Sequence, residues 1–175
     1  MVFLGSFYKL ILQRRSFILL ALFEIGLAYV IYTNVFHIQR LTGMPILDME
    51  IGYTVDRVNE IFAAYGPLGF AHYRIIMVAD IIHPAVYATL MGAVMWVLAD
   101  GRRMKAVSIL PLFVALFDWA ENLMIWRMVS DPFPVDYRWA EAGNILSYLK
   151  HGTLALVFVL LALLLFRRMM QALFY

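Results

Sequence analysis

The stretch ILSYLKHGTLALVFVLLALLLF, residues 145–166, decides the fold class of this chain. Lys150 is its only formally charged side chain, and from Leu154 onward the stretch contains no polar residue. A helix rises about 1.5 Å per residue, so a stretch of this length can cross a hydrocarbon core about 30 Å thick. The sequence therefore predicts a membrane-spanning helix here.

Three further apolar stretches of similar length precede it, at residues 16–36, 75–98 and 106–126. Across the 175 residues, 64% are hydrophobic and only 15% are charged, whereas soluble domains have roughly 25% charged residues. This composition excludes a soluble globular domain. It predicts a single all-α membrane domain over residues 1–175, built as an antiparallel bundle of four transmembrane helices.

A cleaved signal peptide is an alternative for the first stretch, because basic residues precede it and residues 17–23 form a short apolar segment. Glu24 interrupts that segment, and no small-x-small cleavage pattern follows before Asn34. A helix that is retained in the mature protein is therefore favoured.

The composition also excludes several classes of function. The chain has no cysteine, which excludes disulfides, thiolate catalysis and thiolate metal sites. No run of basic residues with interleaved aromatics indicates binding to nucleic acid. The expected surroundings are a lipid bilayer, with a lipid-like small molecule or other membrane-protein subunits as candidate partners. No motif identifies a cofactor.

Basic residues beside the four stretches predict which side of the membrane each connection faces. The two terminal segments and the connection around residues 100–105 share one side, where Asp100 is the single acid. Eight basic residues lie on that side: Lys9, Arg14, Arg15, Arg102, Arg103, Lys105, Arg167 and Arg168. The other side has five arginines but seven acids, namely Asp48, Glu50, Asp56, Glu60, Asp131, Asp136 and Glu141. We expect both termini to be cytoplasmic, in a bacterial inner (plasma) membrane.

A short amphipathic helix is predicted at residues 55–65, inside the long first external connection. Thr54 can cap its start, and Gly66 with Pro67 can end it. Apolar residues recur along it at helical spacing, while charged residues take its other face. Such a helix can lie on the outer interface and cover the bundle, or it can simply pack on the bundle with no gating role.

Ionisable side chains inside the apolar stretches are costly and are therefore a default sign of function. At helical rise, Asp80, Asp118 and Glu121 would lie about 8–12 Å below the outer boundary, and these three are the candidate catalytic residues. Most of the remaining candidates for ligand binding or a polar network share this layer in the outer half of the membrane. Glu24 is expected nearer the midplane, as a neutral acid hydrogen-bonded to a neighbouring helix; contact with Tyr87 is the alternative. These candidates are His83, Tyr87, Asn122, Ser147, Lys150, His151 and Glu24.

Helical spacing supports the grouping of these residues. Asp118, Glu121 and Asn122 stand at i, i+3 and i+4 and so share one face of a helix. Pro84 removes the hydrogen bond to the carbonyl of Asp80 and predicts a kink there. The freed carbonyl would need a partner inside the bundle, which a water, a cation or Lys150 could supply.

Three interpretations of this polar layer remain open. In the first it is structural: Lys150 pairs with Asp80 or Asp118, and the other groups hydrogen-bond between helices. In the second, the carboxyl groups and a histidine carry out proton transfer on an apolar substrate. The third is a site for zinc or iron, although no H-E-x-x-H motif is present. Its ligands would be His83, His151 and Glu121, with Asp118 or Asp80.

The segments D-I-I-H-P at residues 80–84 and P-L-F-V-A-L-F-D-W-A-E-N at residues 111–122 resemble a pattern in small four-helix bacterial membrane proteins of unassigned function. The similarity extends over residues 52–166. The positions that carry it are Asp80, Pro84, Asp118, Glu121, Asn122 and Lys150. The resemblance implies a four-helix membrane fold and no activity, so a non-catalytic accessory subunit or assembly factor of a larger complex stays an alternative. The chain is also loosely similar to the sterol-isomerase-like domain, which buries acids and a histidine among four helices, but the spacing of those groups differs here.

Overall fold

The computed structural model describes the backbone at residues 2–130 and 133–174, and all side chains there except those of residues 2, 3, 102 and 103. Within these ranges the chain is helical, with no strand. Its α-helices are α1 (Val2–Ile11), α2 (Arg14–Thr42), α3 (Val55–Ala79), α4 (His83–Leu98), α5 (Gly101–Lys105), α6 (Leu110–Ser130) and α7 (Tyr137–Phe174). Two 3-10 helices, η1 (Leu47–Met49) and η2 (Ala106–Ile109), complete the described elements. Three charges used in the orientation prediction, on Arg102, Arg103 and Asp131, lie outside the described side chains.

Four helical stretches in the described residues are long and apolar enough to cross a membrane: Arg14–Thr42, Val55–Ala79, Ala106–Ser130 and Tyr137–Phe174. This finding confirms the prediction of an all-helical chain with four long apolar helices. Three of the stretches contain the predicted segments 16–36, 106–126 and 145–166. The remaining predicted segment, 75–98, falls on the end of α3 and on the shorter apolar helix α4.

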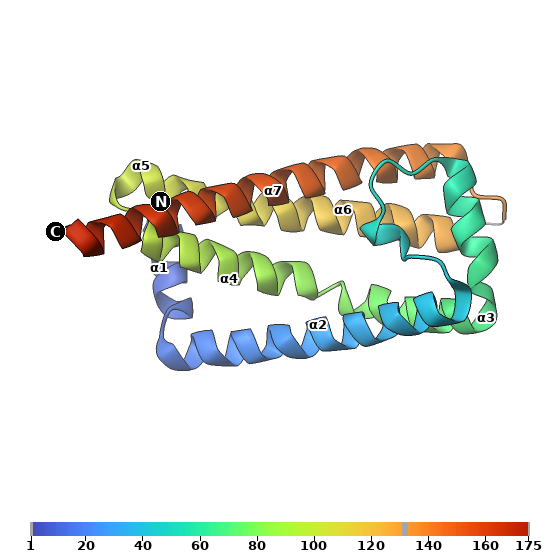
Figure 1. Cartoon of the computed structure of the whole chain (residues 1–175), viewed down its shortest axis with the longest axis horizontal. Helices are drawn as coiled ribbons and strands as arrows, with labels where there is room; N and C mark the ends of the chain where they lie inside the picture. The colour runs from blue at the N-terminus through green and yellow to red at the C-terminus, as the bar shows by residue number, and fades with distance from the viewer. Residues whose placement is uncertain (1, 131–132, 175) are drawn as a thin grey trace.

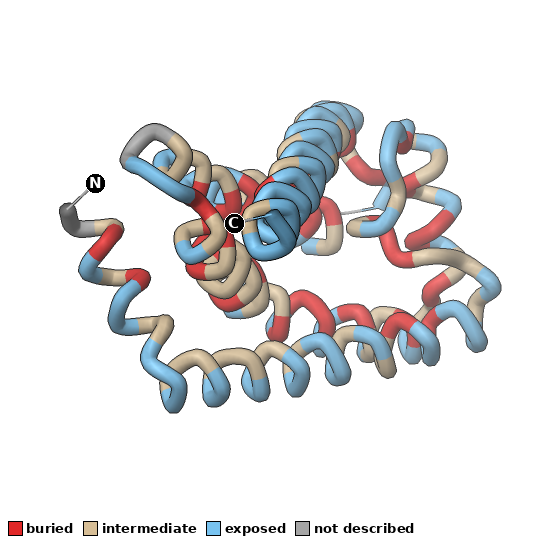
Figure 2. The backbone as a smooth tube through the Cα atoms, turned by 60° about the vertical axis from the view of Figure 1, so that its left-hand side comes forward, coloured by how far each residue is buried: buried red, intermediate tan, exposed pale blue. Residues whose placement is uncertain are grey.

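The helices form an elongated arrangement (Figure 1). Helices α2, α4, α6 and α7 lie along its length, while α1 and α5 lie at the end where α7 finishes. Figure 2 shows that buried residues face the inside of this arrangement, whereas most of α2 is exposed or intermediate. Val35 and Ile38 are the residues of α2 that are buried.

Helix α3 changes direction at Gly66, where φ is 56° and ψ is −173°. Residues 55–65 run across one end of the molecule, and residues 67–79 turn back along α2 (Figure 1). The hydroxyl of Thr54 accepts a hydrogen bond from the backbone nitrogen of Arg57 at 3.3 Å. The predicted helix at 55–65 is thus confirmed, together with its cap and its end at Gly66. This φ, ψ combination is open essentially to glycine alone.

The kink predicted at Asp80 from Pro84 is confirmed as a break at residues 80–82, after which α4 begins at His83; the predicted bounds 75–98 are wrong, because the preceding helix already runs from residue 67. Pro84 lies in the first turn of α4, where a missing N–H costs nothing. Two side chains of α6 bind carbonyls freed by this break. The indole nitrogen of Trp119 donates to the carbonyl of Ile81 at 2.9 Å, and the amide of Asn122 donates to that of Asp80 at 3.4 Å. Asn122, rather than Lys150, is therefore the partner of this carbonyl.

Helix α1 is fixed to the rest of the chain by Tyr8, which is fully buried. Its hydroxyl donates to the backbone carbonyl of Ser108 at 2.8 Å, and its ring lies 5.8 Å from that of Trp96. The ring passes directly over Gly92 of α4, at a distance that leaves no room for a side chain there. A glycine in α4 thus allows α1 to pack closely.

Candidate functional site

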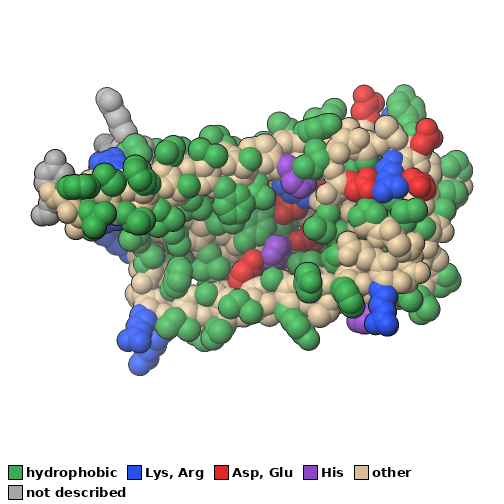
Figure 3. Space-filling view, viewed as in Figure 1, with side chains coloured by type: hydrophobic (Ala, Val, Ile, Leu, Met, Phe, Trp, Pro, Cys, Tyr) green, Lys and Arg blue, Asp and Glu red, His purple; other side chains and the backbone are tan. Residues whose placement is uncertain are grey.

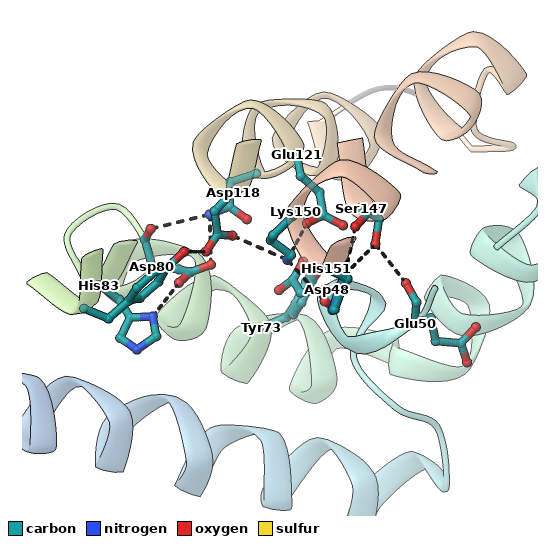
Figure 4. A network of polar contacts seen from close by, with 12 residues as sticks. Asp48, Glu50, Tyr73, Asp80, His83, Asp118, Glu121, Ser147, Lys150 and His151 are labelled. Atoms are coloured by element: carbon teal, nitrogen blue, oxygen red, sulfur yellow. Dashed lines mark hydrogen bonds and ion pairs between the residues drawn. The ribbon is translucent and has the colours of Figure 1, made fainter. Parts of the chain in front are cut away.

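Lys150 of α7 lies at the centre of a network of polar contacts (Figure 4). Its ammonium group forms ion pairs with Glu121 and, at 3.4 Å, with Asp118, both on α6. It also donates to the backbone carbonyl of Asp48 at 3.4 Å. Glu121 is fully buried and Lys150 is 8% exposed. An ammonium has three donors, and all three of these donors face acceptors of the protein.

Helix α4 joins the network through Tyr87, whose hydroxyl donates to Oδ2 of Asp118 at 2.8 Å. Because Oδ1 of Asp118 faces Lys150, both oxygens of this carboxylate have partners. The pairing of Lys150 with Asp118 was one of the two pairs predicted from sequence. The other, with Asp80, is not formed. Asp118 and Glu121 stand three residues apart on one face of α6, so both reach the ammonium group of Lys150.

His83 stands between two acids from different helices. Its Nε2 lies 2.9 Å from Oε1 of Glu24 on α2, and its Nδ1 lies 3.3 Å from Oδ1 of Asp80. The other oxygen of Asp80 accepts a hydrogen bond from Asn122 at 2.8 Å. The expectation that Glu24 lies apart from the other polar groups is therefore wrong, whereas its predicted contact with a neighbouring helix is confirmed, with His83 as the partner.

Asp48 is a member of the network that the sequence did not reveal. The sequence predicts an external connection around Asp48, but residues 43–54 fold back against the helices, and Oδ1 of Asp48 accepts a hydrogen bond from Tyr73 of α3 at 3.2 Å. The hydroxyl of Ser147 donates to the carbonyl of Glu50 at 3.2 Å and holds the same connection to α7. A usable signal was the apolar run Pro45, Ile46 and Leu47 immediately before the acid.

The carboxyl of Asp48 gives the protein an expected pH dependence. Burial raises the pKa of Asp48 from 3.8 to about 8, and the nearby charge of Lys150 opposes this shift in pKa only in part. Between these two values the folded state holds a proton that the unfolded state has lost. The free energy of unfolding should therefore fall as the pH rises from about 4 to 8, by at most about 1.4 kcal/mol per pH unit for this group.

Thermal unfolding in detergent at pH 5, 6, 7, 8 and 9 measures this effect. The Asp48→Asn side chain cannot ionise. The thermal unfolding midpoint of this variant should therefore fall less with rising pH than the midpoint of the unaltered protein. Parallel pH profiles for the two proteins would show that Asp48 does not titrate in this range.

His151 does not join His83. Its Nδ1 lies 2.9 Å from the backbone carbonyl of Ser147 and 3.4 Å from the Ser147 hydroxyl, both on its own helix. Among the described residues, no three His, Asp or Glu side chains are placed so that they could hold a metal ion. The predicted metal site of His83, His151 and Glu121, with Asp118 or Asp80, is therefore not assembled.

The network opens into a groove of about 330 Å³ between α2 and α7. One part of its wall is polar and the other is apolar, formed by Met91, Leu154 and Phe158. Its polar lining residues are Glu24, His83, Tyr87, Asp118, Lys150 and His151. Figure 3 shows histidine and acidic side chains within this hollow, midway along the molecule and framed by apolar side chains.

Comparison of the chain with protein-family models, with curated proteins and with solved structures gives no match. The geometry of the groove and of the network behind it is therefore the basis for an interpretation of function.

Proposed function

We propose that the chain is an integral membrane protein that crosses the bilayer four times as an antiparallel bundle. The crossings are α2, the broken helix of residues 67–98, α6 and α7. Apolar length and composition support three of them directly, and the change of direction at Gly66 supports the second. Both termini lie on the cytoplasmic side, where the basic residues gather, and the resemblance described above favours a bacterial inner membrane.

Reporter fusions measure this orientation. A reporter fused after Arg168 should be active in the cytoplasm, whereas a reporter inserted within residues 43–54 should be active only outside. An external signal from the Arg168 fusion would contradict the orientation, because all three basic segments would then face the wrong side.

The proposed function is the binding of a lipid-like molecule in the groove between α2 and α7. The observation that carries this proposal is the division of the groove wall into a charged part and an apolar part, next to exposed apolar surface of α7. Phe158, which lines the apolar part of the groove, is itself 53% exposed. An amphiphile in the bilayer could reach the groove sideways, with its polar end against the charged residues and its tail along Leu154 and Phe158.

The charged part of the groove also suits proton transfer, which is the second candidate function. His83 faces Glu24 and Asp80 through its two ring nitrogens, so a proton can pass between the ring and a carboxyl group over one hydrogen bond. Tyr87 and Asp118 form a second donor–acceptor pair at the same wall. Groups of this kind are those that general acid–base chemistry uses.

Filling the apolar part of the groove tests the binding proposal. Leu154→Trp places a large ring beside Met91 and Phe158 and should abolish retention of a bound lipid, with binding reduced at least about tenfold because the ring occupies the site. Leu156→Trp is the matched control, since Leu156 is exposed on the same helix outside the groove.

Mass spectrometry of each gently purified protein measures bound lipids and partner proteins. Equal lipid retention by both variants would contradict the proposal. A larger complex that survives in both variants without bound lipid would favour the accessory-subunit alternative.

A further inference from the structure

The hydrogen-bond donors that line the groove are already used by the protein. Lys150 directs its ammonium group at Asp118, Glu121 and the carbonyl of Asp48. The hydroxyl of Tyr87 donates to Asp118. The nitrogens of His83 face two carboxyl groups. A ligand that brings only acceptors therefore finds no donor available at this wall.

Acceptors, in contrast, are left open. Oε2 of Glu24 is buried and has no hydrogen-bond partner, although the other oxygen of the same carboxyl faces His83. The ring of His151 offers a second acceptor. Its Nδ1 lies against the carbonyl of Ser147, which can only accept, so Nδ1 carries the proton. In the neutral ring Nε2 then carries a lone pair and can accept a hydrogen bond. His151 lines the groove.

The balance of charge points in the same direction. Glu24 and Asp118 line the groove, and two further acids, Asp80 and Glu121, stand behind them in the network. Among the described residues, Lys150 and His83 are the basic side chains that pair with these acids. An anionic head group would add negative charge to a wall with more acids than bases, which is unfavourable in a poorly solvated site.

We infer that the ligand of this groove is an amphiphile whose head group donates hydrogen bonds and carries no negative charge. The inference rests on the proposed function and narrows its ligand class. A primary ammonium on an apolar chain fits best, since it supplies both a positive charge and donors to Glu24 and His151. A long-chain alcohol supplies one donor and no charge and should bind more weakly. Phosphate and carboxylate head groups are disfavoured by the same wall.

Three amphiphiles with the same twelve-carbon tail test the inference on the full-length protein: dodecylamine, dodecanol and dodecyl phosphate. Native mass spectrometry at a fixed amphiphile concentration measures the occupancy of each. The amine should bind at least about tenfold more tightly than the phosphate, because a hydrogen bond between charged groups is worth a factor of this size. Tighter binding of the phosphate would overturn the inference and leave the proposed lipid site standing.

A variant of Glu24 tests whether this carboxyl group is responsible for the preference for the amine. Glu24→Gln should weaken binding of dodecylamine about tenfold, by the same energetic argument, and should leave dodecanol binding within about a factor of two. Glu141→Gln, which alters an exposed acid elsewhere on α7, should change neither. Equal amine binding by the Glu24 variant and the unaltered protein would overturn the role of Glu24. If none of the three amphiphiles binds the unaltered protein better than it binds Leu154→Trp, the proposed function itself fails.

Discussion

Replacement of Lys150 with methionine is expected to lower the free energy of unfolding by about 3–5 kcal/mol. The ammonium lies between Glu121 and Asp118, in a place where Glu121 has no exposed surface. Methionine keeps much of the length and apolar volume of the side chain, so the change removes the charge and the three donors but creates little empty space. Two buried carboxyl groups and a backbone carbonyl then lose their common partner.

A double variant distinguishes the loss of charge balance from a simple defect in packing. Lys150→Met combined with Glu121→Gln removes one unpaired acid and should recover part of the lost stability, measured by thermal or denaturant unfolding in detergent. Lys9→Met provides a control at a lysine outside the network, and it should stay within about 0.5 kcal/mol of the unaltered protein. If Lys150→Met unfolds with an unchanged midpoint, the network does not stabilise the fold.

Gly92→Ala is expected to displace α1, with a loss of about 1–3 kcal/mol from overpacking. A Cβ added at residue 92 would lie 2.7 Å from Cζ of Tyr8 and 2.9 Å from the carbonyl oxygen of Ser108. The ring of Tyr8 is fully buried and cannot move aside within its site, and the Ser108 carbonyl belongs to the backbone. The strain should therefore be relieved by movement of α1 away from α4.

Limited digestion with trypsin measures this movement, because Lys9 lies within α1. Cleavage after Lys9 should be faster in Gly92→Ala than in the unaltered protein, and the unfolding midpoint should fall. Gly26→Ala is the matched control in another helix, where an added Cβ would meet nothing within 4 Å; alanine there should be neutral or slightly stabilising. Equal digestion of all three proteins would contradict the proposed role of Gly92.

The long apolar helices could be predicted from the sequence because hydropathy over about 20 residues is a local property. The bounds of the second predicted segment, 75–98, were less accurate. The helix already runs lengthwise from residue 67, through His72 and Arg74, ahead of the predicted start at residue 75. His72 has a hydrogen-bonding partner on the neighbouring helix α2: its Nδ1 lies 2.8 Å from Oδ1 of Asn34. A contact between residues so far apart in the sequence cannot be read from local composition.

The network was only partly predictable for a similar reason. Helical spacing placed Asp118 and Glu121 on one face of α6, and both reach Lys150. The partner of Glu24 and the place of Asp48 depended on where α3 breaks and how residues 43–54 fold back. These are features of tertiary structure, and no periodic pattern in the sequence encodes them.

The order of the charges along the chain bears on how such a protein could be made. The five acids of the network, at positions 24, 48, 80, 118 and 121, are synthesised before the lysine that pairs with two of them. If the segments enter a bilayer in the order of synthesis, Glu24 and Asp80 can meet His83 early, whereas Asp118 and Glu121 are inserted before the lysine that pairs with them. The charge balance of the interior is completed only when α7 arrives. A chain that stops before residue 150 would thus hold Asp118 and Glu121 without the cation that balances them.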